Sequence, residues 1–291
     1  MLGFLLIDKP RGLTSHDVIY RLRKKLGIKR IGHAGTLDPM ATGLLVVGVG
    51  PATRFLPFLQ LEPKEYEFRV EFGRTTETYD TEGSVTSERP VPADLESRIS
   101  AGLCQFLGDI EQMPPVYSAV KKDGRPLYSY ARKGEAVERK ARRIRIEELG
   151  MTRLDSPSAE FKVVCSSGTY VRSIAHDLGE RVGCGGHATS IRRTRAGRFS
   201  VSDAVDLETV SAGDIINARA ALAPMPCVSL DAVGVEMVGQ GRPIAYSNLS
   251  EHEKHVFLSD LGGSPLGIAE VSDGTLHPKC MLPREEGVAQ R

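Results

Sequence analysis

The sequence lacks tryptophan and has only five cysteines, an odd number that is spread along the chain without any C-x-x-C pair. This pattern excludes a disulfide framework and favours a reducing compartment, so we expect a cytoplasmic protein. Cys184 and His187 offer two of the four ligands that zinc needs, and no Walker loop is present; we therefore expect neither a metal nor a nucleotide cofactor. No apolar run approaches about 18 residues, which excludes a membrane-spanning helix. Residues 1–9 lack the basic flank and cleavage site of a signal peptide.

The net charge of +1 conceals an asymmetry between two parts of the 291-residue chain. Residues 1–199 hold 32 Lys and Arg against 24 Asp and Glu, a net charge of +8, whereas residues 200–291 hold 6 against 13, a net charge of −7. The length suits one large domain, or a large and a small one. A basic body suits a polyanionic partner, although ordinary solvated surface charge gives the same count.

Hydrophobic periodicity predicts an α+β protein. Alternation is clearest over residues 64–73, where Tyr66, Phe68 and Val70 share one face of a half-buried strand. An N-cap at Thr14 precedes an amphipathic helix that ends before a glycine. Further strands are predicted over residues 3–9, 43–50 and 159–164 and from about 144, and further helices are predicted from 51 and over 94–106, 174–182 and 202–223.

Residues 32–43 read GHAGTLDPMATG and contain one acid among small residues. The glycines permit backbone angles and close approaches that side chains forbid. Pro39 biases Asp38 toward an extended conformation, which keeps its carboxylate out of a helix interior. The structural alternative is a turn in which Asp38 caps the next element.

This string resembles the GHxGxLDPxAxGxL motif of the TruB-type tRNA pseudouridine synthases. The resemblance implies that Asp38 is the catalytic residue and that His33 contacts the substrate. Residues 9–16, KPRGLTSH, are similar to the first motif of that family. On this basis Lys9 is also expected to bind substrate.

Three further stretches carry the resemblance. The strand at 64–73 matches the family's KxYxxxxxxG pattern, which implies that Tyr66 stacks on the target base; the alternative is a core aromatic. Residues 73–83 match GxxTxTxDxxG, for which a polar hairpin loop is the alternative. Residues 112–128 resemble QxPPxYSAxKxxGxxxY, a segment whose lysines suit RNA backbone contacts, Lys121 among them.

Residues 165–172, CSSGTYVR, match the family's CSxGTYIR. The resemblance makes Arg172 the ion-pair partner of the catalytic carboxylate and places Tyr170 beside the base. An arginine within ~4–6 Å would keep such a carboxylate ionised; without the resemblance, Arg172 reads as a surface cation. Residues 186–199 resemble a motif ending in LRRTxxGxF, with Ile191 in place of the usual leucine as an apolar wall. Arg192 and Arg193 are then candidate phosphate contacts, or ordinary surface charges.

The resemblance implies the pseudouridine synthase fold, with a mixed, mostly antiparallel sheet flanked by helices. It implies a catalytic domain over residues 1–227 and a PUA-like small β-barrel over 228–291, whose acidic charge leaves either an RNA-binding or a structural role. The implied reaction converts uridine 55 in the T arm of tRNA to pseudouridine, without cofactor or metal, in a monomer. Attack on ribose, attack on the base and a glycal route stay open. The alternatives are an RNA-binding module that folds tRNA without chemistry, and a guide-RNA-dependent synthase subunit.

Overall fold

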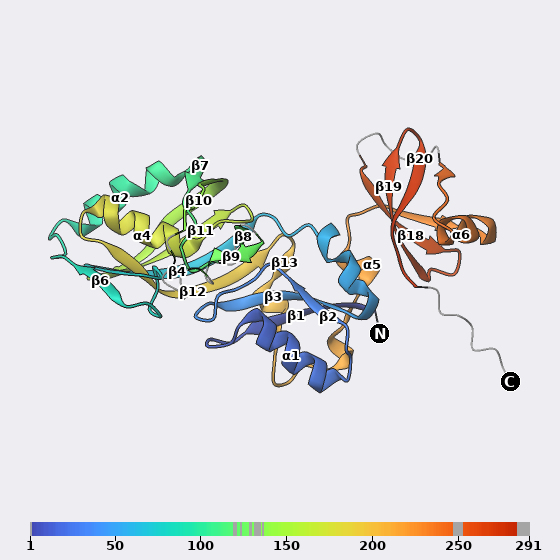
Figure 1. The fold of residues 1–291 in the computed structure, drawn as a ribbon, viewed down its shortest axis with the longest axis horizontal. Helices are drawn as coiled ribbons and strands as arrows, with labels where there is room; N and C mark the ends of the chain where they lie inside the picture. Colours follow the sequence, from blue (N-terminus) through green and yellow to red (C-terminus); the bar gives the residue numbers. More distant parts are fainter. Residues whose placement is uncertain are drawn as a thin grey trace.

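The computed structural model describes residues 2–118, 121–122, 124–127, 130, 135, 137–246 and 253–283, with the backbone alone at 121, 122 and 126. Figure 1 shows an elongated molecule in which a large mixed sheet with helices lies beside a smaller, curled sheet formed by the last part of the chain. No helix in the described part is both long and apolar enough to cross a membrane.

The large sheet provides the platform of the molecule. Its main path runs β14-β1-β3-β12-β4-β11-β10-β7, and three short strands pair at its margins. The described strands of this sheet are β1 (Gly3–Lys9), β2 (Ile31–Ala34), β3 (Thr42–Val49), β4 (Lys64–Phe72), β7 (Gly108–Gln112), β10 (Arg142–Asp155), β11 (Ser158–Cys165), β12 (Gly186–Ala196), β13 (Phe199–Ser200), β14 (Val205–Asp206) and β15 (Ile216–Asn217).

Pairing within this sheet is mostly antiparallel. Only the β1–β14 and β3–β12 pairs are parallel, so the predicted mixed, mostly antiparallel sheet is confirmed. The predicted alternation in β4 is also correct: Tyr66, Phe68, Val70 and Phe72 are buried on the face covered by helix α4. The neighbouring segment, β12, was identified in the sequence only through a motif, without a prediction of its secondary structure. It is a strand that pairs with β4 with two register shifts.

Helices cover the sheet where apolar stripes were predicted. Helix α1 (Ser15–Leu26) begins with the expected cap, since Thr14 and Asp17 form a capping box, and it ends at Gly27 in the left-handed conformation. The other described helices are α2 (Leu95–Leu103), α4 (Val171–Val182), α5 (Ala218–Ala221), α6 (Ala232–Gly239) and the 3₁₀ helices η1 (Gly50–Phe58), η2 (Cys104–Phe106), η3 (Val201–Asp203) and η4 (Ala212–Asp214). Two hairpin-sized sheets pair β5 (Arg74–Thr76) with β6 (Val85–Glu88) and β8 (Lys121–Lys122) with β9 (Arg125–Pro126).

The helix predicted over residues 202–223 is wrong. This segment forms short 3₁₀ turns and two edge pairings to β1, and only α5 is helical. Its serines and aspartates bind nearby backbone instead: Asp206 accepts from the N–H of Glu208, and Ser211 forms a capping box with Asp214. Such local side-chain hydrogen bonds compete with a continuous helix.

The acidic last part of the chain forms the predicted small barrel-like unit. Its curled sheet has the order β16-β18-β19-β20-β17, in which only β16 and β18 are parallel. The strands are β16 (Cys227–Leu230), β17 (Ile244–Ala245), β18 (His255–Asp260), β19 (Pro265–Ser272) and β20 (Thr275–Met281). Phe257 of this sheet packs edge-on against Phe55 of η1, with ring centroids 6.1 Å apart, so the two sheets share one apolar core.

This shared core gives a stability prediction. Phe257 is 1% exposed, and Phe257→Ala removes a ring from between the two sheets, so we expect a loss of about 3–5 kcal/mol in the free energy of unfolding. Urea titration followed by circular dichroism measures it. Val233→Ala, at a 66% exposed position, is the control and should change the value by less than about 0.5 kcal/mol. Equal losses in both variants would show that the two sheets do not share a core.

Candidate active site

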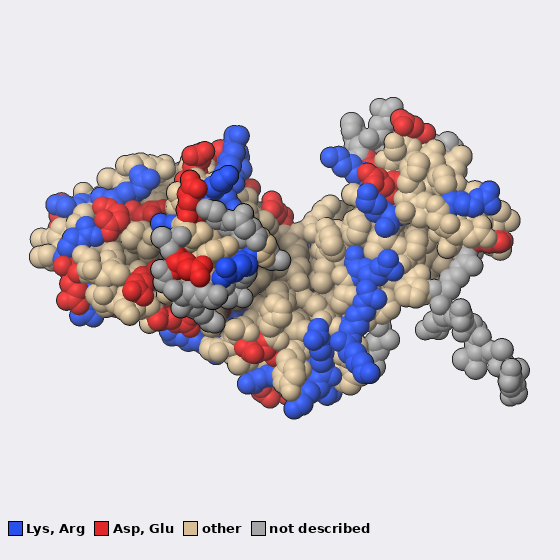
Figure 2. All heavy atoms as spheres, in the orientation of Figure 1, with Lys and Arg blue, Asp and Glu red and all other residues tan. Residues whose placement is uncertain are grey.

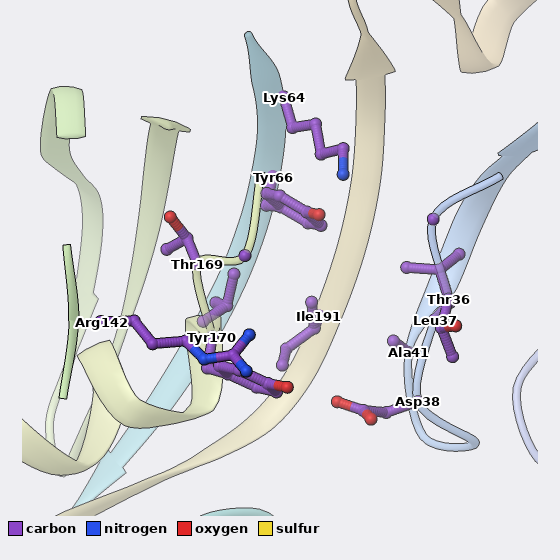
Figure 3. Close-up of a pocket in the computed structure, with 13 residues that line it drawn as sticks. Thr36, Leu37, Asp38, Ala41, Lys64, Tyr66, Arg142, Thr169, Tyr170 and Ile191 are labelled. Carbon is purple, nitrogen blue, oxygen red and sulfur yellow. The ribbon is translucent and has the colours of Figure 1, made fainter. Parts of the chain in front are cut away.

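A cavity of about 310 Å³ opens where β4, β12, the loop before β3 and the start of α4 meet. Figure 3 shows the Tyr66 and Tyr170 rings and Ile191 along one side, and the loop with Asp38 facing them. The lining residues are Gly35, Thr36, Leu37, Asp38, Ala41, Lys64, Tyr66, Arg142, Gly168, Thr169, Tyr170, Val171 and Ile191. The structure thus brings together five of the predicted site residues, counting Arg172 directly behind Asp38.

The loop that carries Asp38 is fixed by the chain around it. The Ser15 hydroxyl accepts from the N–H of Leu37 at 2.9 Å and donates to the Leu37 carbonyl at 3.2 Å. The N–H of Gly12 donates to the Pro39 carbonyl at 2.8 Å. A Cβ at Gly43 would lie 2.3 Å from the carbonyl oxygen of Arg193, so only glycine lets the loop approach β12 this closely.

Arg172 and Asp38 form the predicted ion pair. Arg172 Nε lies 2.9 Å from Asp38 Oδ2, and the arginine side chain is 4% exposed whereas that of the aspartate is 36% exposed. Helix α4 begins at Val171 rather than at the predicted Ile174, which places Arg172 in its first turn. The cation is buried behind the carboxylate, and the carboxylate faces the cavity. This arrangement places a positive charge directly against the Asp38 carboxylate.

Asp80 is a third member of this network, and the sequence reasoning assigned it no role. Its Oδ2 lies 3.1 Å from Arg172 Nη1, and it is 1% exposed. Thr78 and the N–H of Glu82 donate to its other oxygen. Arg172 also donates to the backbone carbonyls of Thr78 and Tyr117, at 2.9 and 3.0 Å. Arg172 is therefore held from one side and presents Nε to Asp38.

The two tyrosines form the aromatic part of the cavity. Burial raises the pKa of Tyr66 and that of Tyr170, so both phenols stay protonated at neutral pH. The side-chain amide of Gln112 fixes the backbone of Tyr170 by accepting from its N–H at 2.8 Å and donating to its carbonyl at 3.0 Å. Gln112 is 3% exposed, so these two hydrogen bonds are buried and hold the Tyr170 backbone in one position.

Two predicted substrate contacts lie outside the cavity wall. Lys9 is fully buried, and its ammonium donates to the carbonyls of Pro10, Leu13 and Pro39; burial lowers its pKa to about 8. A direct contact from Lys9 is therefore contradicted, because its side chain holds the Asp38 loop from behind. His33 lies on β2, half-buried and edge-on to His16 with ring centroids 5.4 Å apart.

The predicted phosphate contacts differ in how far they are exposed. Arg193 is 1% exposed and donates to the carbonyls of Leu44 and Gly35, so the structure contradicts a phosphate contact by this residue. No local pattern indicates this burial, because an arginine pair in the sequence reads as surface charge. Arg192 is partly exposed and forms a bidentate ion pair with Asp8. The side chain of Lys121 lies outside the described residues.

Lys64 and Arg142 line the cavity without having been predicted to do so. Lys64 is part of the KxYxxxxxxG match, and Arg142 is part of a basic run. Neither pattern predicted a role for these two residues in the site. Among the described residues no group of three or more metal-ligating side chains is present. The arrangement offers a charged carboxylate, an aromatic surface for a planar ring and buried cations on both sides.

His33 gives a pH prediction. Burial lowers its pKa to about 4, against 6.5 for an ordinary histidine, and His16 and Arg193 add to the shift. The unfolded chain therefore binds this proton at a higher pH than the folded chain. The contribution of His33 to stability is complete above pH 6.5 and is lost as the pH falls toward 4. We expect His33→Gln to reduce the drop in urea midpoint between pH 7 and pH 5; an unchanged drop contradicts this.

The sequence matches three described families in consecutive segments. Residues 23–171 match the TruB family pseudouridylate synthase (N terminal domain). Residues 172–225 match the tRNA pseudouridylate synthase B C-terminal domain, and residues 226–282 match the C-terminal domain of pseudouridine synthase II TruB. Together these matches cover most of the chain.

Curated relatives and solved structures agree with this. A tRNA pseudouridine synthase B of Opitutus terrae is 51% identical over 210 residues, 72% of this chain and 87% of its own. That of Cupriavidus metallidurans is 42% identical over 96% of this chain and 94% of its own. A Cbf5-Nop10-Gar1 complex contains a chain of similar fold, with a TM-score of 0.67 at 24% identity, over 92% of this chain and 78% of that one. A Nop10-Cbf5 complex gives 0.68 at 22% identity over 97% and 87%, which bears out the predicted pseudouridine synthase fold.

Proposed function

The chain belongs to the TruB family of pseudouridylate synthases, and from this premise we propose that it converts uridine 55, in the T loop of tRNA, to pseudouridine with Asp38 as the essential group. Isomerisation of uridine to pseudouridine in tRNA is the activity that it shares with its relatives. The observation that carries the assignment to Asp38 is its 2.9 Å ion pair with the buried Arg172 at the edge of a cavity lined by two tyrosines.

The target base has to leave the RNA stack to reach this cavity. Unstacking costs a few kcal/mol, and stacking on an aromatic side chain returns about 1–3 kcal/mol per base. Tyr66 offers the ring for this stack, and Ile191 closes the cavity beside it. The backbone of Tyr170 is fixed by its hydrogen bonds to Gln112, so the Tyr170 ring limits the positions that the nucleotide can occupy.

Asp38 then acts on the nucleotide in its ionised form. The C1′–N1 bond breaks, the uracil turns within the cavity, and C5 bonds to C1′. A carboxylate serves this reaction either as a nucleophile or by stabilising positive charge on the ribose. Arg172 orients the Asp38 carboxylate through their ion pair, and Asp80 holds Arg172 in place. Attack on ribose, attack on the base and a glycal route are all compatible with these contacts.

The surface supports a polyanionic substrate. Figure 2 shows Lys and Arg gathered in a stripe over α1 and η1, which we call the basic stripe. Its exposed members are Arg21, Arg23, Lys24, Lys25, Lys29, Arg30 and Arg54. Such cations contact phosphates and release counterions, which strengthens RNA binding at low salt. We place the T arm of tRNA against this side.

We also propose the division into a catalytic domain, 1–227, and a PUA-like domain, 228–291, with the first carrying all chemistry. The curled sheet formed by β16 to β20 begins at Cys227, which supports this boundary. We also propose that the chain acts as a monomer. The five free cysteines suit a reducing cytoplasm.

Incubation of the purified chain with an unmodified tRNA transcript, followed by mapping of pseudouridine, tests the proposal. We expect stoichiometric modification at position 55 and none in a transcript that carries cytidine there. Binding without modification would indicate a module that folds tRNA without chemistry. A requirement for an added guide RNA and protein would indicate a synthase subunit, and modification at other positions would contradict the site assignment.

A further inference from the structure

Lys64, at the start of β4, is a buried cation in the catalytic cavity. The reaction steps assigned to Asp38 and the tyrosines do not involve it. It is 9% exposed and lines the cavity. Figure 3 shows its ammonium next to the Tyr66 ring, at the end of the cavity away from Asp38. The two charged side chains therefore lie toward opposite ends of the cavity.

The ammonium of Lys64 is unpaired within the described part of the chain. Among the residues that the structure describes, it forms neither a hydrogen bond nor an ion pair within 4 Å, and Glu62 influences it only from farther away. Burial and the guanidinium of Arg193 lower its pKa. A buried cation without a partner is costly, and an anionic ligand relieves that cost.

A second cation reinforces this end of the cavity. A methyl group at Gly35 would lie 3.3 Å from Arg193 Nη1 and 3.5 Å from Lys64 Nζ, so both cations converge on the same point. Arg193 donates to the backbone carbonyls of Leu44 and Gly35, which carry no full negative charge. The cavity is thus positive at this end and negative at Asp38.

The reaction produces a charge that fits this polarity. When the C1′–N1 bond breaks, its electron pair moves to N1 and spreads over O2 and O4 of the uracil. C5 then bonds to C1′, and the proton lost from C5 is balanced by the proton gained at N1. Attack on the base instead places the negative charge on O4. In each route the uracil carries negative charge before the new bond is complete.

We propose that Lys64 is a catalytic residue whose ammonium binds a carbonyl oxygen of the uracil and stabilises the negative charge that develops on the base. This inference rests on the proposed function, because it names the group that Lys64 contacts in that substrate. Lys64 acts on the base in each of the three routes, whichever atom Asp38 engages. Removing one preorganised donor of this kind costs about 10²–10³-fold in rate.

Single-turnover kinetics on the tRNA transcript test this. We expect Lys64→Met to lower the rate constant by about 10²–10³-fold, with tRNA affinity within threefold of the unaltered protein. Lys64→Arg keeps the charge and should recover at least tenfold over Lys64→Met. Lys162→Met is the matched control, since Lys162 lies on the neighbouring β11 and pairs with Glu65 outside the cavity; its rate should not change.

A transcript with 5-fluorouridine at the target position separates charge stabilisation from a structural role. Fluorine withdraws electrons and stabilises the uracil anion without help from the protein. The rate constant measured is that for consumption of the target nucleoside. The factor by which Lys64→Met lowers this rate constant should therefore be at least tenfold smaller with 5-fluorouridine than with uridine. An equal defect on both substrates, or an unchanged rate in Lys64→Met, overturns the inference. If Lys64→Met does not fold, Lys64→Gln and Lys64→Arg carry the same comparison. Failure of the unaltered protein to modify the transcript would instead overturn the proposed function.

Discussion

Asp38→Asn is expected to abolish pseudouridine formation while tRNA binding persists. The substitution removes the negative charge and changes little else, because the side chain keeps its size and is 36% exposed at the cavity edge. An amide is neither a nucleophile nor a counter-charge for the ribose. Since Asp38 acts within the network that holds it, we expect the single-turnover rate to fall by at least about 10⁴-fold.

Rapid-quench kinetics with excess enzyme measure that rate, and filter binding measures the affinity for tRNA. Affinity should stay within about threefold, because the basic stripe is untouched. Glu62→Gln is the matched control: this carboxylate accepts from the N–H of Ser167 and lines a neighbouring pocket rather than the catalytic cavity. Conversion by Asp38→Asn at more than a hundredth of the normal rate would show that another group performs the chemistry.

Arg172→Lys is expected to lower the single-turnover rate by about 10²–10³-fold. A lysine keeps the charge but cannot bind Asp38, Asp80 and the Thr78 carbonyl at the same time, as the guanidinium does. Asp38 then loses its fixed orientation, and a misplacement of about 1 Å is enough for a loss of about 10²-fold. The unfolding free energy should fall as well, since Asp80 stays buried with a weaker partner.

Arg192→Lys provides the comparison for this second prediction. It alters a neighbouring arginine that pairs with Asp8 at a partly exposed position outside the cavity, so we expect its rate to stay within about threefold. Both variants are compared by single-turnover rate and by urea midpoint. A rate in Arg172→Lys as high as in Arg192→Lys would show that the buried guanidinium only supports the fold.

The sequence predicted the parts of the site that a local pattern controls. The alternation of residues 64–73 placed Tyr66 on a buried face, and the glycine-rich loop predicted an acid held outside a helix. The pairing of Asp38 with Arg172 came from the family resemblance, since no local rule joins residues so far apart in the chain.

The remaining features depend on tertiary packing. The burial of Lys9 and of Arg193 results from carbonyl oxygens supplied by distant segments, which no local pattern reveals. Asp80 stood in a recognised turn, but its role appears only when α4 brings Arg172 beside it. The helix predicted over 202–223 failed because serine and aspartate side chains bind their own turns.

A double-mutant cycle of Asp80→Asn and Arg172→Lys, read out as single-turnover rate constants on the tRNA transcript, tests most directly whether Asp38, Arg172 and Asp80 act as one unit. If Asp80 works only by fixing the guanidinium that holds Asp38, the double variant will be no more than about threefold slower than the slower single variant. A double variant whose loss equals the product of the two single losses would contradict this account.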